Sequence, residues 1–403
     1  MERAHVPGMA ANSLISPAPR RPPATGRPIL LMGASALSLV SFRAALIRHL
    51  RANGNHVIGC AGLRPEDPAT EIQDQLSAWG VDFRILPLEN NRIQPWGDLR
   101  FLGRLWKIIR ETRPQILLAY NIKPVVYTGW LGRWAGVPTR VAMITGLGNA
   151  FAGTGNPPRI RRRFFTQLYR FGLRGFQGVI FQNEDDHREL VDTGVVPPTQ
   201  KTCLIRGSGV DLDKFKEEPM PEFPPVFLMI TRLIRPKGVL EYVEAAHRLK
   251  AKHPTVRFQL LAQPCRNPQR LDSSLLENWR REKNLEILPP CADVRPALRA
   301  CHVLVLPSYR EGTPNVVLEA MATGRAIITT DVPGCRQTVE PGGNGCLVPA
   351  RDSVALELAM ETLIARPETV WAMGRKSRLM AEERFDQNEQ SRRLVAWMGL
   401  TGA

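Results

Sequence analysis

The chain has 403 residues, of which 43% are hydrophobic and 23% are charged, the balance of an ordinary soluble globular protein. This composition excludes fibrous, wholly disordered and multi-spanning membrane proteins. Its 54 basic and 38 acidic side chains give a net charge of +16, which indicates a polyanionic partner such as nucleic acid, an anionic membrane or a phosphorylated substrate.

The first 27 residues are rich in Pro, Ala and Arg without an apolar core, so we expect a disordered tail over 1–27. From residue 28 on, short apolar runs alternate with helical patterns, as in a parallel α/β sheet. The predicted strands are 29–32, 57–59, 116–119, 140–144, 178–181 and 202–205. The predicted helices are 39–50, 99–112, 126–135 and 161–171.

Residues 216–225 contain four prolines, the composition of a linker. The alternation then restarts, with a helix at 239–250. The strands of this second part are predicted at 226–230, 256–261, 285–288, 303–306, 326–329 and 345–348. We therefore predict two doubly wound α/β domains, 28–215 and 226–384, that face each other across a cleft. A last helix in 385–403 is expected to pack back on the first domain.

Cysteines and apolar runs bear on the compartment. The seven cysteines include no Cys-x-x-Cys pair, which indicates reduced structural thiols in a reducing cytoplasm. The longest apolar run, residues 28–42, is shorter than the roughly 20 residues that a spanning helix needs. We expect a cytoplasmic protein without a signal peptide.

The stretch 303–324 predicts a strand, a loop and a helix. Thr313 suits the N-cap, Pro314 the first helical position and Gly324 the C-terminal cap. Glu311 lies in the loop, and Glu319 lies about 9 Å along the helix from its start. One carboxylate could then reach a ligand bound at the strand end, and the other could reach a polar group further along the same ligand.

The backbone amides of Gly312 to Val316 would point out of the start of this helix and form an anion site. Amides for phosphates and carboxylates for hydroxyls are the groups that a nucleotide sugar requires. The alternative is that Glu311 and Glu319 are ordinary surface carboxylates on a capped helix.

The arrangement Pro-Ser-x-x-Glu-Gly-x-Pro-x-x-x-Leu-Glu-Ala-Met-Ala-x-Gly at 307–324 resembles the retaining glycosyltransferases of family 4. These have the GT-B fold of two Rossmann-like domains with the active site between them. Residues 230–238 are similar to the family's Gly-Arg-Leu-x-x-x-Lys-Gly loop, with Thr231 replacing Gly. Segments 120–124, 144–148 and 181–186 resemble bacterial enzymes that extend undecaprenyl-diphosphate-linked glycans, including N-acetylgalactosaminyltransferases.

The resemblance implies roles for the matching residues. Arg232 and Lys237 would hold the donor diphosphate and stabilise it as the leaving group, and Glu311 would contact the donor sugar; these three are the candidate catalytic residues. Glu319 would accept hydrogen bonds from the ribose. The remaining donor-binding residues implied by the resemblance are Gly312, Thr313, Pro314 and Asn315.

The resemblance further implies retention of anomeric configuration, a UDP-sugar as co-substrate, and no metal or other cofactor. Two positions depart from the family pattern. Gln337 stands where many relatives carry Glu, which removes a negative charge but keeps hydrogen bonding. Ala262 and Gln263 replace the usual glycine after the third strand of the second domain.

Four first-domain residues are weaker candidates. Gly33 follows the first strand and would let the donor approach closely, or is a plain turn glycine. Asn121 and Lys123 stand where many relatives place a sugar-contacting His, and Lys123 is either a phosphate ligand or a solvated loop residue. Gly146 belongs to the segment 144–148 and is a candidate contact for the acceptor or its phosphate.

The positive charge is concentrated in residues 1–215, which hold 28 basic and 16 acidic side chains. Its densest run is 159–174, with Arg159, Arg161, Arg162 and Arg163 flanking a face expected to contain Phe164, Phe165, Leu168 and Phe171. Such a helix lies in a membrane surface, or it packs its apolar face on the sheet while its arginines are solvated. Both can hold if the arginines face anionic lipid.

These patterns favour a glycosyltransferase on the cytoplasmic face of the plasma membrane. It would transfer a hexose or N-acetylhexosamine from a nucleotide-sugar donor to a lipid-linked glycan acceptor. The alternatives are a related enzyme with a soluble acceptor or a non-UDP donor, and a nucleic-acid-binding protein. The last would explain the charge but not the spacing of Glu311 and Glu319, so we expect no nucleic-acid partner.

Overall fold

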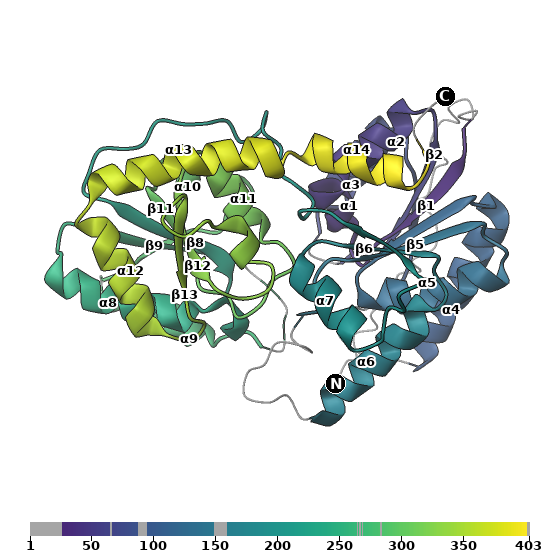
Figure 1. Cartoon of the computed structure of the whole chain (residues 1–403), viewed down its shortest axis with the longest axis horizontal. Helices are drawn as coiled ribbons and strands as arrows, with labels where there is room; N and C mark the ends of the chain where they lie inside the picture. Colours follow the sequence, from purple (N-terminus) through teal and green to yellow (C-terminus); the bar gives the residue numbers. More distant parts are fainter. Residues whose placement is uncertain are drawn as a thin grey trace, which may run out of the picture.

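The computed structural model describes residues 26–64, 67–87, 95–148, 159–263, 265, 267, 269–282 and 284–400. Nearly all of the predicted tail, 1–27, lies outside them. Figure 1 shows two α/β domains side by side, with α13 and α14, in yellow, running along one edge of both.

The first domain is built on a seven-stranded sheet in the order β3-β2-β1-β4-β5-β6-β7, and every pairing is parallel. Its strands are β1 (Pro28–Met32), β2 (His56–Ala61), β3 (Asp82–Ile85), β4 (Ile116–Tyr120), β5 (Thr139–Ile144), β6 (Gly178–Phe181) and β7 (Lys201–Leu204). Its helices are α1 (Ala36–Phe42), α2 (Ala44–Ala52), α3 (Ala69–Ala78), α4 (Pro95–Thr112), α5 (Ile122–Trp134), α6 (Arg159–Leu173) and α7 (Glu184–Asp192).

The second domain is built on a six-stranded parallel sheet in the order β10-β9-β8-β11-β12-β13. Its strands are β8 (Val226–Arg232), β9 (Arg257–Gln263), β10 (Glu286–Leu288), β11 (Val303–Leu306), β12 (Ala326–Thr330) and β13 (Gly345–Val348). Its α-helices are α8 (Val239–Lys252), α9 (Ser273–Glu282), α10 (Arg295–Arg299), α11 (Asn315–Ala322), α12 (Ser353–Ile364) and α13 (Pro367–Arg384), and α14 (Gln387–Trp397) follows. Two 3-10 turns, Arg235–Lys237 and Arg336–Thr338, complete it.

Each sheet is buried on both faces. In β1, Leu30 and Met32 belong to one apolar core, whereas Ile29 and Leu31 belong to the core on the opposite face. Continuous apolar strands of this kind are typical of parallel sheets covered by helices on both sides. The predicted fold of two doubly wound domains is confirmed.

Several elements differ from the sequence prediction. The helix predicted at 39–50 is two helices, α1 and α2, because Arg43 leaves the helical region (φ −122°, ψ 3°). The buried Arg43 guanidinium then lies over the Tyr120 ring and donates to Ser208 Oγ at 2.7 Å. Strand β3 and helices α3, α7, α9, α10, α12 and α13 were not predicted.

The chain passes between the domains twice, and the two passages lie side by side. Val210 N donates to Phe385 O at 2.7 Å, and Gln387 N donates to Val210 O at 3.1 Å. The first passage continues into the linker, whose Pro219 carbonyl accepts from the buried Arg325 at 3.1 Å. The second leads into α14, which places Leu394 and Val395 in a core of the first domain.

Candidate active site

A lysine–carboxylate pair joins two loops of the second domain. Lys237 ends the 3-10 turn after β8, and its Nζ donates to Glu311 Oε1 in the loop after β11. Ser308 Oγ donates to the same carboxylate oxygen at 2.7 Å. Both partners are largely buried, with 18% and 14% of their side chains exposed. The loop after β11 is therefore joined to the loop after β8 by an ion pair within the protein.

Gly238 explains why the two loops meet. It has φ +72°, and a Cβ at this position would lie 2.1 Å from Pro307 O. Only glycine accommodates both the left-handed backbone and this contact. The Lys-Gly sequence recognised in the motif thus places the loop after β8 directly against the end of β11.

Helix α11 begins one residue later than predicted. Pro314 is its N-cap and Asn315 its first residue, with no side-chain capping bond. Thr313 does not cap the helix, because its hydroxyl instead donates to Gln182 O in the first domain at 3.1 Å. Gly324 follows the C-cap with φ +81°, as the sequence predicts.

Glu319 lies half-buried on α11, and among the described residues its carboxylate has no hydrogen bond or ion pair. Loss of hydration raises the pKa of Glu319 to about 7, although Lys214 opposes the rise. A carboxylate in this setting is short of hydrogen-bond donors, which the hydroxyls of a ligand would supply.

Arg232 ends β8 with an exposed side chain that has no ion pair within the described part of the chain. At the next strand, Gln263 Nε2 donates to Cys291 O at 2.7 Å, which ties the end of β9 to the loop after β10. The replacement of the usual glycine by Ala262 and Gln263 therefore adds a bond between two strand ends.

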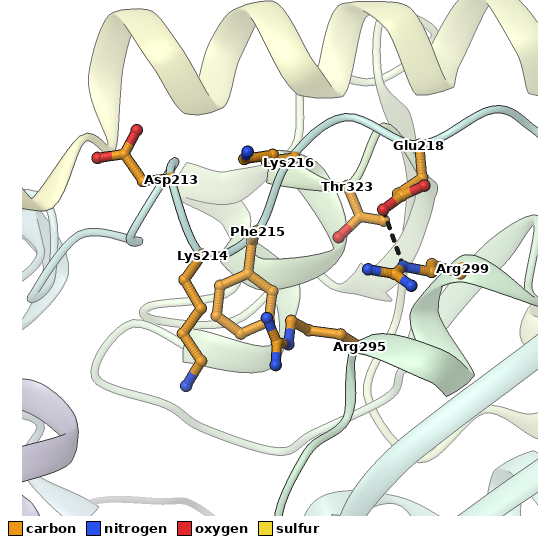
Figure 2. A pocket seen from close by; sticks show the side chains of 8 residues that line it. All are labelled: Asp213, Lys214, Phe215, Lys216, Glu218, Arg295, Arg299 and Thr323. Carbon is orange, nitrogen blue, oxygen red and sulfur yellow. Dashed lines mark ion pairs between the residues drawn. The ribbon is translucent and has the colours of Figure 1, made fainter.

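Pocket-lining residues near Glu319 come from three segments (Figure 2). The pocket is lined by Asp213, Lys214, Phe215, Lys216, Glu218, Arg295, Arg299 and Thr323. Lys214, whose charge acts on Glu319, was missed by the sequence analysis. The usable signal was its place three residues after the sequence Gly209-Val210-Asp211, at the passage between domains.

Glycines allow the two domains to touch beside Glu311. Gly146 has φ +123°, and its Cβ would lie 3.0 Å from Gly312. A Cβ on Gly312 would lie 2.0 Å from Thr145 O, and one on Gly334 would lie 2.4 Å from Glu311 O. The structure thus brings Gly146 to the loop 307–313 of the second domain (called the donor loop below, after its predicted role), where only backbone fits between the domains.

Gln337 also lies at this contact. Its Nε2 donates to Thr313 Oγ1 at 2.7 Å and to Gln182 O at 3.1 Å. A glutamate carboxylate cannot donate either bond. The departure from the family pattern therefore gives this chain a hydrogen bond between its domains.

The other first-domain candidates are engaged with the protein. Asn121, at φ +69°, accepts from Ala34 N at 3.3 Å and donates to Thr145 Oγ1 at 3.2 Å. Lys123 pairs with Asp98 of α4 at 3.6 Å. A Cβ on Gly33 would lie 2.2 Å from the Tyr120 hydroxyl, so side-chain packing accounts for this glycine.

Comparisons with known proteins identify the family of this chain. The family profile "Glycosyl transferase 4-like domain" matches residues 40–206, and "Glycosyl transferases group 1" matches residues 224–366. Together the two matches span most of both domains. The chain belongs to these glycosyltransferases.

Two bacterial relatives and one solved structure illustrate the similarity of this glycosyltransferase to known proteins. The N,N'-diacetylbacillosaminyl-diphospho-undecaprenol alpha-1,3-N-acetylgalactosaminyltransferase of Campylobacter jejuni is 26% identical, covering 81% of this chain and 86% of its own. An Escherichia coli UDP-Gal:alpha-D-GlcNAc-diphosphoundecaprenol alpha-1,3-galactosyltransferase is 26% identical over 62% of this chain and 64% of its own. Anabaena HepE in complex with UDP has a TM-score of 0.70 at 17% identity, over 92% of this chain and 99% of that one. This likeness shows the GT-B fold.

The buried face of the arginine-rich helix α6 differs from the one that the sequence predicts. Tyr169 and Leu173 are buried in the core with Phe165 against them, whereas Phe164 and Phe171 are 51% and 56% exposed. The sheet-facing side is thus one helical face and the outward phenylalanines another.

The predicted arginines of α6 have different settings. Arg162 pairs with Glu189 at 2.9 Å, and Arg163 is exposed. Arg159 and Arg161 belong to α6, but their side chains lie outside the described part.

Three further observations concern the glycosyltransferase as a whole. No helix among the described residues is long and apolar enough to cross a membrane. Within the same residues, no group of three or more His, Cys, Asp or Glu side chains is arranged to hold a metal ion. All seven cysteines are free, and burial raises the pKa of Cys301 and Cys335 to about 12.

Proposed function

We propose that this glycosyltransferase moves a hexose or N-acetylhexosamine from a UDP-sugar to a polyprenyl-diphosphate-linked saccharide, with retention of anomeric configuration. The observation that carries the proposal is the ion pair of Lys237 with Glu311 in the loop before α11, the helix that also carries Glu319. The names of the two bacterial relatives, which specify undecaprenyl-diphosphate-linked substrates and in one case UDP-Gal, support the choice of donor and acceptor.

The proposed roles follow from charge and position. Arg232 and Lys237 hold the donor diphosphate and stabilise the charge that it gains on leaving. Glu311 contacts the donor sugar, and Glu319 accepts hydrogen bonds from the ribose. Backbone groups of Gly312–Asn315 complete the donor site.

In the proposed reaction, the bond from the anomeric carbon to the diphosphate oxygen breaks as the acceptor oxygen attacks from the same face. The acceptor proton passes to the departing diphosphate, so no covalent protein nucleophile is needed. The cations Arg232 and Lys237 supply the positive charge at the diphosphate, and we propose that the reaction requires no metal or other cofactor.

A panel of nucleotide sugars with an undecaprenyl-diphosphate-linked saccharide tests this function. We expect UDP release only when both donor and acceptor are present, and a product with the anomeric configuration of the donor by NMR. Absence of turnover with every nucleotide sugar, or an inverted product, would contradict the proposal.

We further propose that the enzyme works on the cytoplasmic face of the plasma membrane, with α5 and α6 toward the lipid. Trp134 is 72% exposed, and Trp130 stacks on the exposed Phe171 with ring centroids 5.1 Å apart. Arg133 and Arg163 are exposed on the same two helices. Aromatic rings prefer the membrane interface, and each arginine near anionic lipid contributes about 1 kcal/mol.

Sedimentation with vesicles tests this orientation. Trp134→Ala/Phe171→Ala should reduce binding to vesicles that contain anionic lipid. Trp371→Ala, which removes an exposed tryptophan of the second domain, is the matched control and should bind like the wild type. Equal binding by all three proteins would contradict the proposed orientation.

A further inference from the structure

The segment 182–186 of the first domain holds the donor loop of the second domain at several points. Gln182 O accepts from Thr313 Oγ1 at 3.1 Å. Asn183 Nδ2 donates to Gly312 O at 2.8 Å. Asp186 forms an ion pair with Arg310. Four consecutive donor-loop residues, 310–313, therefore include three that bond directly to the other domain.

The ion pair is the charged contact among these, and it is largely buried. The Arg310 side chain is 6% exposed and that of Asp186 is fully buried, and Arg310 also bonds Glu189 Oε2 at 2.7 Å. Asp186 Oδ2 accepts from Asn183 Nδ2 at 3.0 Å and from Leu147 N at 3.3 Å. Burial raises the pKa of Asp186, and Arg310 opposes that rise.

A buried ion pair adds little net stability, because desolvation of both charges offsets their attraction. Its contribution is to fix geometry, since the bonded partners tolerate few arrangements. Arg310 immediately precedes Glu311 in the chain, so the position of its guanidinium constrains the carboxylate that bonds Lys237. The same segment fixes the backbone of Gly312 through Asn183.

We propose that Asp186 and Asn183 are positioning residues that act through Arg310 and Gly312 to hold Glu311 and the start of α11 in the geometry for transfer. The first domain would thereby set the donor site of the second, in addition to any contact with the acceptor. This inference rests on the proposed function and extends it to residues that act through their contacts with the other domain.

A second ion pair provides a matched comparison. Arg336 bonds Asp185 at 2.7 Å. This pair also joins the two domains, through the residue that precedes Asp186. The Arg336 side chain is 41% exposed, and it belongs to a 3-10 turn and not to the loop that contains Arg310. Loss of this pair removes a bond between the domains and leaves Arg310 and Glu311 in place.

The test compares Asp186→Asn/Arg310→Met with Asp185→Asn/Arg336→Gln in the full-length protein. The first variant removes both buried charges and keeps an amide oxygen to accept from Leu147 N. We expect it to melt close to the wild type, because the desolvation cost is removed with the attraction. Its kcat should nevertheless fall about 10-fold or more, and the second variant should keep the wild-type kcat.

Hydrogen–deuterium exchange gives a readout that needs no turnover. We expect amides of 310–316 to exchange faster in the first variant and unchanged in the second, while the amides of β8 keep their protection in both. The single variant Asp186→Asn keeps Arg310, which can still bond Glu189. It should therefore retain part of the protection of these amides.

Each failure has its own signature. If wild-type protein turns over no sugar donor, the proposed function fails, and exchange alone decides the positioning role. A folded first variant with wild-type exchange over 310–316 overturns the positioning role, as does one with wild-type kcat in an enzyme that transfers sugar.

Discussion

The two sides of the domain boundary use their polar side chains in different ways. In the second domain, Arg232 and Glu319 have no hydrogen bond or ion pair among the described residues. In the first domain, Asn121 bonds two loops, and Lys123 is paired with Asp98. The second domain thus leaves two charged candidates without a described protein partner, besides its Lys237–Glu311 pair, whereas Asn121 and Lys123 of the first are bonded to that domain's own residues.

This difference shows what a residue's position in a motif does and does not establish. Both sets of residues follow the ends of parallel strands, where ligands bind in such folds. Only the contacts distinguish a group that awaits a ligand from one already satisfied by protein. The following variants test the distinction.

Lys237→Ala should have the largest effect. Loss of the cation removes charge stabilisation at the diphosphate and leaves Glu311 without its partner, so we expect transfer to fall about 100-fold or more. Steady-state kinetics measures the change. Lys252→Ala, which removes a lysine paired with Glu357 on the surface, is the control. Wild-type turnover in Lys237→Ala would remove this lysine from the site.

Gly312→Ala should have the second-largest effect on transfer. Its Cβ would lie 2.0 Å from Thr145 O, so the domains must separate beside Glu311. We expect transfer to fall about 10-fold or more, because a displacement near 1 Å disturbs the reacting geometry. The control is Gly103→Ala in α4, where a Cβ meets nothing within 4 Å; it should stabilise the helix by about 0.5–1 kcal/mol.

Glu319→Gln tests the unsatisfied carboxylate through pH. The folded pKa of about 7 lies above the ordinary 4.5, so the folded state loses stability as the pH rises through this range. Gln should therefore raise the free energy of unfolding at pH 8, by at most about 3 kcal/mol, and change it little at pH 5. Denaturant unfolding at both pH values measures this.

The same variant should lose activity while it gains stability. A neutral amide is a weaker acceptor for ribose hydroxyls, so we expect transfer at pH 8 to fall about 10-fold. Unchanged stability at pH 8 would show that the carboxylate already has a partner.

Lys123→Met should have the smallest effect on transfer. It breaks a largely buried pair with Asp98, and we expect a loss of about 3 kcal/mol in unfolding free energy with less than about a threefold change in transfer. A large fall in transfer with unchanged stability would place Lys123 among the ligand-binding groups and remove the contrast between the domains.

The fold and the donor loop were predictable because their signals are local. Apolar strands in regular alternation with helices indicate parallel sheets, and Lys237, Gly238, Glu311 and Glu319 lie within short motifs whose spacing fixes their place. Strand β3 was missed because its charged residues Asp82 and Arg84 alternate with Phe83 and Ile85 and leave no apolar run. Helix α7 was missed because its first turn is acidic and offers a weak apolar face.

The contacts between elements far apart in sequence were not predictable. Asp186 and Arg310 are separated by 124 residues, and their pairing depends on how two independently folded sheets meet. The same holds for Asn121 and Ala34, 87 residues apart. The spacing of residues within one segment does not indicate contacts with segments far away in the sequence.

Because α14 returns to the first domain, that domain is not a contiguous piece of the sequence. A cut within the linker would leave the first fragment without Leu394 and Val395, and its core would be exposed to water where they pack. Two-fragment complementation should therefore restore the enzyme only when the second fragment carries α14. A circular permutation that opens the chain between α13 and α14 would, in contrast, give each domain a continuous stretch of sequence.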